Sequence, residues 1–249
     1  MTEYAKDPGG TQPLIEHLLE LRRRLIWIAG VLLLVFAALV PFAQQLYTFV
    51  AQPLMANLPA GGQMVAIDVI TPFFVPIKVT LMAAFLLTLP HTLYHAWAFV
   101  APALYQNEKK LVYPLVFSSL ILFAAGMAFA YYLVFPVIFK FLAGVTPAGV
   151  SMATDIDKYL SFVLGMFVAF GMTFEVPVVV VLLNRMGMVS LEQLQKARAY
   201  VIVGAFVVAA IVTPPDVISQ TLLAVPLIIL YEVGIWVCRL TASKKETVQ

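Results

Sequence analysis

Charged side chains are scarce in this 249-residue chain: Asp, Glu, Lys and Arg make up 11% of it, whereas 62% of the residues are hydrophobic. Soluble domains carry about 25% charged residues. Large exposed apolar patches are not tolerated in water, so a soluble fold of this size has no place for so much apolar surface. The composition excludes an ordinary cytosolic enzyme and a disordered chain, and it predicts an integral membrane protein.

Cysteine and histidine are also rare. The single cysteine, Cys238, has no partner for an intrachain disulfide, and the histidines are His17, His91 and His95. Disulfide-stapled modules need several cysteines, and zinc sites need three or four clustered ligands. We therefore expect no disulfide, no metal site and no cofactor. His91 and His95, which flank Tyr94, are typical of the aromatic belt at a membrane interface.

Long apolar runs are what the sequence has instead. A membrane-spanning helix needs about 20 mainly apolar residues. We expect one all-α membrane domain over residues 1–249 with six transmembrane helices, at about 25–42, 73–99, 111–139, 159–183, 199–212 and 217–237. The apolar parts of spans 5 and 6 cover only roughly 21 to 24 Å, less than a hydrocarbon core of ~30 Å. The bilayer is therefore expected to thin around them.

Basic residues predict the orientation, because they concentrate on the cytoplasmic side of membrane proteins. One side of the predicted topology has only Lys140 and Lys158, while Lys78 lies in span 2 and can snorkel. The other side carries Lys6, Arg22, Arg23, Arg24, Lys109, Lys110, Arg185, Lys196, Arg198, Arg239, Lys244 and Lys245. We therefore expect both termini in the cytoplasm.

Segments outside the spans also have predicted structure. Leucines recur at helical spacing over residues 12–24, which predicts an amphipathic helix that lies on the membrane surface and runs into span 1. Residues 190–193 have capping-box spacing and predict a short helix. The outer loops 43–72 and 140–158 are long enough to form an outer cap.

Glu175 is the clearest single candidate for a functional residue, at ~12 Å inside the cytoplasmic end of span 4. A charged carboxyl there is unfavourable, and Pro177 frees the carbonyl of Thr173, which predicts a bend. Two interpretations stay open: a wet or titrating site facing the membrane, or a protonated or hydrogen-bonded packing residue. Glu232 lies near the end of span 6, where it can reach the headgroups.

Two further acids, Glu20 and Glu108, fall on the expected cytoplasmic side, and both have basic neighbours. Local ion pairing at a surface is the ordinary interpretation and contributes little. A binding role for the two carboxylates is the alternative.

Four segments resemble signatures of the TatC family, the multi-spanning subunit of the twin-arginine protein translocase. They are HLLELRRRL at 17–25, WAFVAPALY at 97–105 running into Glu108, FGMTFEVP at 170–177 and TPPD at 213–216. The resemblance covers about residues 12–239, in order. It implies a receptor that binds the twin-arginine signal peptides of folded proteins and nucleates their export, driven by the proton-motive force.

The resemblance also implies a binding site for such a peptide. Glu20 and Glu108 would pair with the two guanidinium groups, whose planar forks match carboxylates. Phe99 and Tyr105 would supply apolar and aromatic contact. Arg22 would help to hold Glu20 in place.

Further roles follow from the same resemblance. Glu175 would line a concave cavity facing the membrane, and Pro53 and Asp216 would support the outer cap and the outer turn. Thr213 and Gln220 would dock the single-span partners TatA and TatB. The expected setting is a bacterial-type inner membrane, in a multimeric complex within the lipid bilayer and without nucleic acid.

The alternative function is a proton-coupled small-solute carrier that uses Glu175. A carrier should bring ionisable or helix-breaking positions from several spans to one midplane site. Here the charged residues lie mostly at one interface, which favours the receptor. No serine–histidine pair, carboxylate pair or metal-ligand set occurs in the apolar runs, so we expect no enzyme.

Overall fold

The computed structural model describes residues 12–57, 63–100, 112–145, 153–213 and 216–246. The elements of this part, in chain order, are α1 (Gln12–Leu39), the 3-10 turn η1 (Val40–Phe42), α2 (Ala43–Asn57), β1 (Gln63–Val65), α3 (Thr71–Val100), α4 (Val112–Phe129), the π-helical turn η4 (Ala130–Val134), α5 (Phe135–Val145), β2 (Ala153–Asp155), α6 (Ile156–Phe174), α7 (Val176–Arg185), α8 (Leu191–Lys196), α9 (Arg198–Val212) and α10 (Val217–Glu246).

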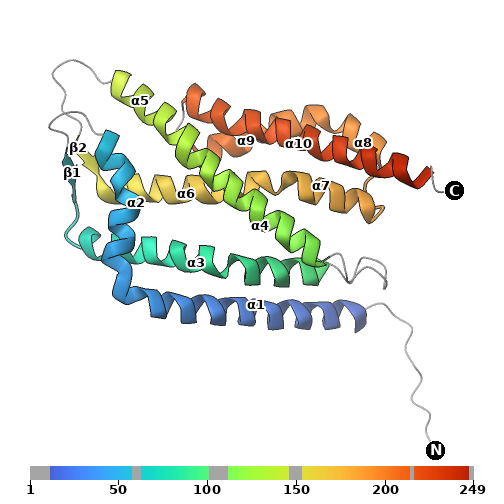
Figure 1. Cartoon of the computed structure of the whole chain (residues 1–249), viewed down its shortest axis with the longest axis horizontal. Coiled ribbons are helices and arrows are strands. Elements are labelled where there is room, and N and C mark those ends of the chain that lie inside the picture. Colours follow the sequence, from blue (N-terminus) through green and yellow to red (C-terminus); the bar gives the residue numbers. More distant parts are fainter. Residues whose placement is uncertain (1–11, 58–62, 101–111, 146–152, 214–215, 247–249) are drawn as a thin grey trace, which may run out of the picture.

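Most of these helices run along the long axis of the molecule, and α2 crosses that direction (Figure 1). The start of α1 and the end of α10 lie at the same end, which we name the termini end. The opposite end holds α2, β1 and β2, and we name it the cap end. The fold is all-helical apart from the short strand pair.

Five helical segments of the described chain are long and apolar enough to cross a membrane: Ile15–Ala51, Thr71–Phe99, Tyr113–Phe141, Ile156–Arg185 and Val217–Leu240. The helix predicted at 199–212 is α9, which has 15 residues and is shorter than these. Span 6 was also expected to be short, whereas the apolar segment Val217–Leu240 of α10 has 24 residues and continues through Pro226. Proline is tolerated inside membrane helices where neighbouring groups satisfy the freed backbone.

The first helix differs from its prediction. Residues 12–24 are helical and run into span 1 as predicted, but they share one unbroken helix with it, since α1 extends from Gln12 to Leu39. A position of these turns on the membrane surface stays a prediction. The chain turns at η1, whose second residue is Pro41. Helix α2 then leads away from α1 (Figure 1). The N-terminal segment therefore extends span 1 along its own axis.

Prolines also shape the two central helices. Pro136 cannot donate to a carbonyl in the preceding turn, and the helix accommodates this with the π-helical turn η4 between α4 and α5. Pro177 lies in the first turn of α7, and the helix is interrupted at Glu175. The interruption lies at the position where Pro177 predicts a bend.

The cap end holds together through segments that are distant in sequence. β1 pairs in parallel with β2, with Met64 opposite Thr154. Below this pair, Lys78 of α3 donates to Asp157 Oδ1 of α6 at 2.5 Å and lies 3.4 Å from the Ser161 hydroxyl. We name these contacts the cap clasp; they join α3 and α6 near their starts at the cap end.

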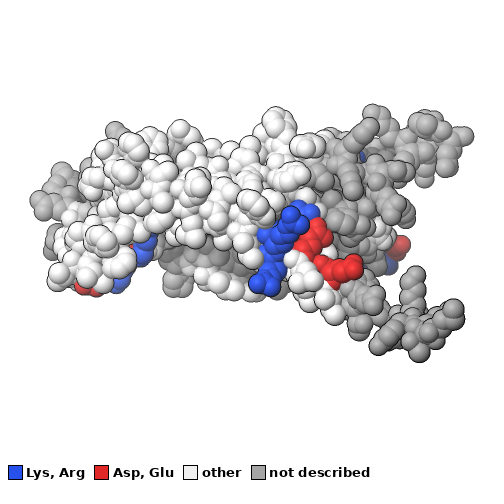
Figure 2. Space-filling view, turned by 90° about the horizontal axis from the view of Figure 1, so that it is seen from below, with Lys and Arg blue, Asp and Glu red and all other residues white. Residues whose placement is uncertain are grey.

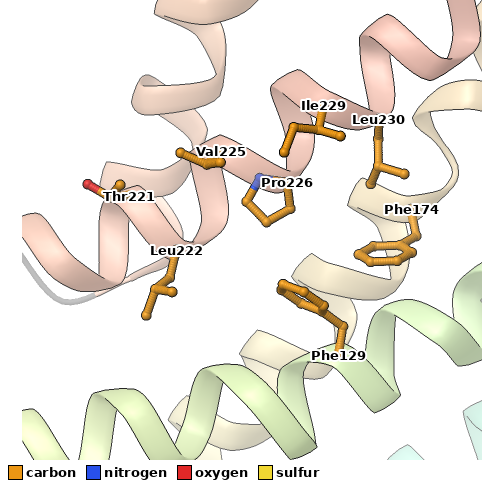
Figure 3. Close-up of a pocket in the computed structure, with 8 residues that line it drawn as sticks. All are labelled: Phe129, Phe174, Thr221, Leu222, Val225, Pro226, Ile229 and Leu230. Atoms are coloured by element: carbon orange, nitrogen blue, oxygen red, sulfur yellow. The ribbon is translucent and has the colours of Figure 1, made fainter.

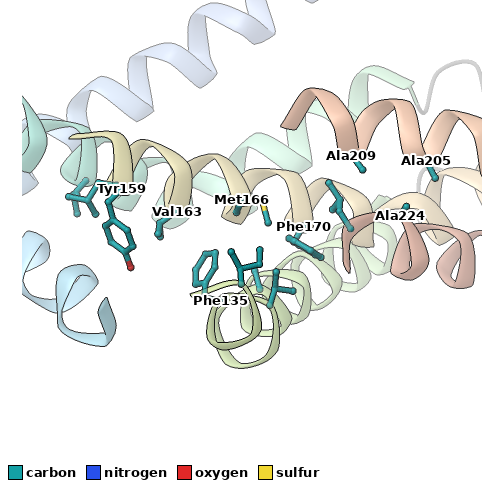
Figure 4. Packing of buried hydrophobic residues seen from close by; sticks show 14 of the residues in the cluster. Phe135, Tyr159, Val163, Met166, Phe170, Ala205, Ala209 and Ala224 are labelled. Carbon is teal, nitrogen blue, oxygen red and sulfur yellow. The ribbon is translucent and has the colours of Figure 1, made fainter. Parts of the chain in front are cut away.

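The core lies where α6 is covered by α3, by the α4–α5 helix and by α9 and α10 (Figure 4). Phe170, Leu160, Met166 and Leu223 are fully buried there. The outward surface is apolar too, with Leu34 of α1 70% exposed, as expected for helices whose solvent is lipid. On the face shown in Figure 2, the charged side chains gather toward the two ends and leave an uncharged area between them.

Candidate functional site

The termini end brings the first turns of α1 against the last turn of α3. His17 stacks on Phe99, with ring centroids 4.2 Å apart and an interplanar angle of 16°. His17, Glu20 and Arg24 share one face of α1, because residues three, four and seven apart lie on the same side of a helix. Arg24 also lies close enough to His95 of α3 to interact with it electrostatically. We name these five side chains the α1–α3 site.

Glu20 is the acid of the α1–α3 site, and its carboxylate already binds a guanidinium group. Arg24 donates to Glu20 Oε1 from Nε at 3.0 Å and from Nη2 at 2.5 Å. The side chains of Glu20 and Arg24 are 36% and 21% exposed. Within the described part of the chain, Glu20 Oε2 accepts no hydrogen bond. As far as the described residues are concerned, this oxygen is therefore open to a second cationic donor.

Arg22 does not take the position predicted for it beside Glu20. The partner of Glu20 is Arg24, four residues further along the helix. Side chains two residues apart on a helix point in different directions, whereas those four apart lie on one face. Arg22 and Arg23 are exposed on α1. Helix geometry therefore explains why Glu20 pairs with Arg24 and not with Arg22.

Of the other residues predicted to contact the peptide, the structure describes Phe99 but not Tyr105 and Glu108. Phe99 is half-buried in the last turn of α3, beneath His17. Tyr105 and Glu108 lie outside the described residues, so their positions relative to Glu20 remain predictions.

Glu175 lies at the break between α6 and α7. Both of its carboxyl oxygens are buried and have no hydrogen-bond partner among the described residues. The Ser119 hydroxyl lies beside this carboxyl without hydrogen-bond geometry to it, and Ser119 instead accepts from Trp97 Nε1 at 3.0 Å. A buried carboxyl without a partner is unfavourable when it is ionised. Of the two interpretations left open by the sequence, a protonated packing residue agrees with this burial, and the wet or titrating site stays a prediction.

An apolar crevice of about 410 Å³ opens next to this break (Figure 3). Phe174, which immediately precedes Glu175, and Phe129 of α4 form one wall, with ring centroids 5.7 Å apart. Pro226 and Ile229 of α10 form the opposite wall. Such a lining suits an apolar chain, since Thr221 is the single lining residue with a polar side chain among the described residues. The concave cavity predicted around Glu175 remains a prediction.

The residues predicted for docking and for the outer cap have separate local roles. Thr213 is 6% exposed, and its hydroxyl donates to a backbone carbonyl one turn earlier at 2.8 Å. Asp216 caps α10, since its Oδ1 accepts from the backbone N–H of Ser219 at 2.7 Å. Gln220 is half-buried in the first turn of α10. Pro53 lies within α2 at the cap end, but its side chain is outside the described part.

Three members of the α1–α3 site were not predicted as site residues: His17, Arg24 and His95. The helical spacing of His17, Glu20 and Arg24 was visible in the sequence, but the register of α1 against α3 was not. No group of three or more potential metal ligands occurs among the residues that the structure describes.

Comparisons with known proteins agree on one family. The sequence profile described as "Sec-independent protein translocase protein (TatC)" matches residues 16–226. The Sec-independent protein translocase protein TatC of Escherichia coli (strain K12) is 53% identical over 234 residues, which cover 94% of this chain and 91% of that protein. The TatC protein of Aquifex aeolicus (strain VF5) is 39% identical over 239 residues, covering 95% of this chain and 99% of that protein.

The fold agrees as well. A crystal structure described as "Twin Arginine Translocase Receptor- TatC" superposes with a TM-score of 0.81 at 38% sequence identity, covering 91% of this chain and 99% of the other. A second crystal structure, of the same receptor in the detergent DDM, gives a TM-score of 0.79 at 37% identity and covers 89% of this chain and 98% of the other. Sequence and fold together place this multi-span membrane protein in the TatC family of Sec-independent protein translocase proteins.

Proposed function

We propose that this chain is the receptor subunit of a twin-arginine translocase, which binds the signal peptides of folded precursor proteins and nucleates their export, driven by the proton-motive force. The observation that carries the proposal is the pair between Glu20 and Arg24, in which a carboxylate at the termini end already holds a guanidinium. The solved relative is described as a twin-arginine receptor, which agrees with this chemistry.

Binding then proceeds by exchange at Glu20. At a surface, an ion pair between residues four apart on a helix contributes only about 0.3–0.5 kcal/mol, and the Glu20–Arg24 pair is of this type and partly exposed. An arginine of the signal peptide can therefore use the open Oε2 and displace Arg24 from Oε1. Lysine lacks the planar fork and fits this exchange less well.

The rest of the peptide site follows from the family resemblance. Glu108 supplies the carboxylate for the second arginine, and Phe99 and Tyr105 contact the residues around the arginine pair. Arg22, exposed on α1, contributes to the charge balance of the site rather than to the position of Glu20.

The proposed orientation places the termini end in the cytoplasm. Arg185 ends α7 and Arg198 begins α9 at the termini end, where Arg239 lies in the last third of α10 and Arg22 in the first half of α1 (Figure 1). Basic residues of short loops and helix ends concentrate on the cytoplasmic side. With α9 as a short additional crossing, the chain has six spans and both termini inside, in a bacterial-type inner membrane.

The proposed assembly contains single-span subunits of the TatA and TatB type and more than one copy of this chain. Gln220 and the turn at Thr213 contribute to docking, while Asp216 and Pro53 support the cap end. Glu175 lines a membrane-facing cavity, where its carboxyl meets water or a polar group of a partner.

The test measures the binding of a labelled twin-arginine peptide to the protein in lipid nanodiscs, by fluorescence anisotropy. Glu20→Ala and Glu108→Ala should each lower the affinity about tenfold, because each removes one charge-assisted hydrogen-bond acceptor. Glu192→Ala is the matched control, since Glu192 is an exposed acid on α8 that pairs with Lys196 outside the α1–α3 site. A peptide with two lysines should bind more weakly than the arginine peptide.

Unchanged affinity in both Glu20→Ala and Glu108→Ala would overturn the proposal, provided that both variants insert and fold. Proton uptake into vesicles coupled to a small solute, abolished by Glu175→Gln, would instead support the carrier.

A further inference from the structure

A groove of about 430 Å³ lies between α9 and α10 at the termini end, away from the α1–α3 site. Its polar lining consists of Arg198 from α9 and of Glu232 and Arg239 from α10. Its apolar lining includes Trp236, Ile228 and Ile229. The groove therefore has one charged end and one hydrocarbon-like end.

The charged end is cationic. Arg198 is held by Glu232, with its Nε 2.7 Å from Oε1 and its Nη2 donating to Oε2 at 2.7 Å. Arg239 is exposed and takes part in none of the ion pairs of the described residues. Two guanidinium groups therefore face one carboxylate, and the remaining positive charge has no partner within the described protein.

The dimensions suit a lipid. Ile228 precedes Arg239 by eleven residues, which is about 16 Å along a helix at 1.5 Å per residue and comparable to half of a ~30 Å hydrocarbon core. Trp236 lies between Ile228 and Arg239 on α10 and is 61% exposed. Exposed tryptophan in a membrane protein is typical of the level of the headgroups. A molecule that fills the groove must therefore be anionic at one end and aliphatic along one leaflet.

We propose that this groove binds an anionic phospholipid, with the phosphate on Arg239 and on the free N–H groups of Arg198, and with one acyl chain along Ile228 and Ile229. Guanidinium forks match phosphate oxygens in a bidentate manner. Basic pockets between membrane helices recognise acidic headgroups in this way. The inference goes beyond the proposed receptor function and does not depend on peptide binding.

Trp236 provides a local readout of the lipid in the groove. Of the three tryptophans, Trp27 and Trp97 are replaced by phenylalanine so that Trp236 alone fluoresces. The protein is placed in nanodiscs of phosphatidylcholine with a minor fraction of phosphatidylglycerol, and bromine is carried on the acyl chains of one lipid or of the other. Bromine quenches tryptophan only at short range, so the quenching reports which lipid occupies the groove.

We expect brominated phosphatidylglycerol to quench Trp236 as if it were enriched about fivefold over its bulk fraction, and Arg239→Gln to abolish most of this enrichment. Arg239→Lys should retain part of it, because the charge remains and the fork is lost. Lys196→Gln is the matched control: Lys196 lies at the same end, on α8, and pairs with Glu192 outside the groove.

Quenching by the two brominated lipids in proportion to their bulk fractions would overturn the proposal, as would an enrichment that Arg239→Gln leaves intact. Quenching by neither lipid would also overturn it, and would indicate that a protein segment fills the groove.

Discussion

Replacing Gly126 by alanine should destabilise the helix bundle, because α4 and α6 approach each other there without room for a methyl group. A Cβ built on Gly126 would lie 2.5 Å from the carbonyl oxygen of Phe170, whereas real Cβ atoms keep at least 3.0 Å from other atoms. The obstacle is backbone, so the two helices must part. Overpacking of this kind costs about 1–3 kcal/mol, and alanine regains up to about 1 kcal/mol of helix propensity. The expected net loss is about 1–2 kcal/mol.

The assay is equilibrium unfolding of the purified protein in mixed micelles, followed by circular dichroism. Gly165→Ala on α6 is the matched control, since a Cβ built there has nothing within 4 Å. This control should unfold at the same denaturant fraction as the unsubstituted protein or at a higher one. If Gly126→Ala and Gly165→Ala unfold together, the close approach of α4 and α6 does not limit stability and the reasoning is refuted.

Two further predictions concern single charged groups. Arg24→Gln should raise the affinity for a twin-arginine peptide about twofold, because the competing pair with Glu20 contributes about 0.3–0.5 kcal/mol. A lower affinity in the same anisotropy assay would show that Arg24 instead orients Glu20. Glu175→Gln should leave the peptide affinity within about twofold of that of the unsubstituted protein. Its stability should be unchanged or higher, since a neutral amide is buried more easily than a carboxylate. Failure of this variant to fold would contradict the expectation.

The helices that build the bundle were predictable because apolar runs are the dominant signal in a membrane sequence. The interruption at Glu175 followed from Pro177 alone, since proline removes a specific backbone donor. The effect of Pro226 was not predictable in the same way. The same residue type leaves α10 unbroken, because the neighbouring helices decide whether the freed carbonyl is satisfied.

The cap end could not be predicted in detail from local sequence. Pro53 and the glycines that follow it indicate a loop, yet Ala43–Asn57 forms α2. The pairing of β1 with β2 joins two segments separated by three helices, and no local pattern specifies such a partner. Each strand has only three residues, too few for an alternating signal.

The site was predictable only in part. The resemblance pointed to Glu20, but it assigned the neighbouring Arg22 rather than Arg24 to the pair with it. The contact between His17 and Phe99 depends on the register of α1 against α3, which is set by packing along the whole length of both helices. Spacing within one helix can indicate a shared face, but it does not identify the helix on which that face packs.

The cap clasp has a mechanical consequence for how this bundle deforms. β1 leads into α3 and β2 leads into α6, and Lys78, the eighth residue of α3, pairs with Asp157, the second residue of α6. Two helices that are joined at one end separate most easily at the other end. We therefore expect any separation of α3 from α6 to be smallest beside the strands and to increase toward Phe99, at the proposed site for the signal peptide.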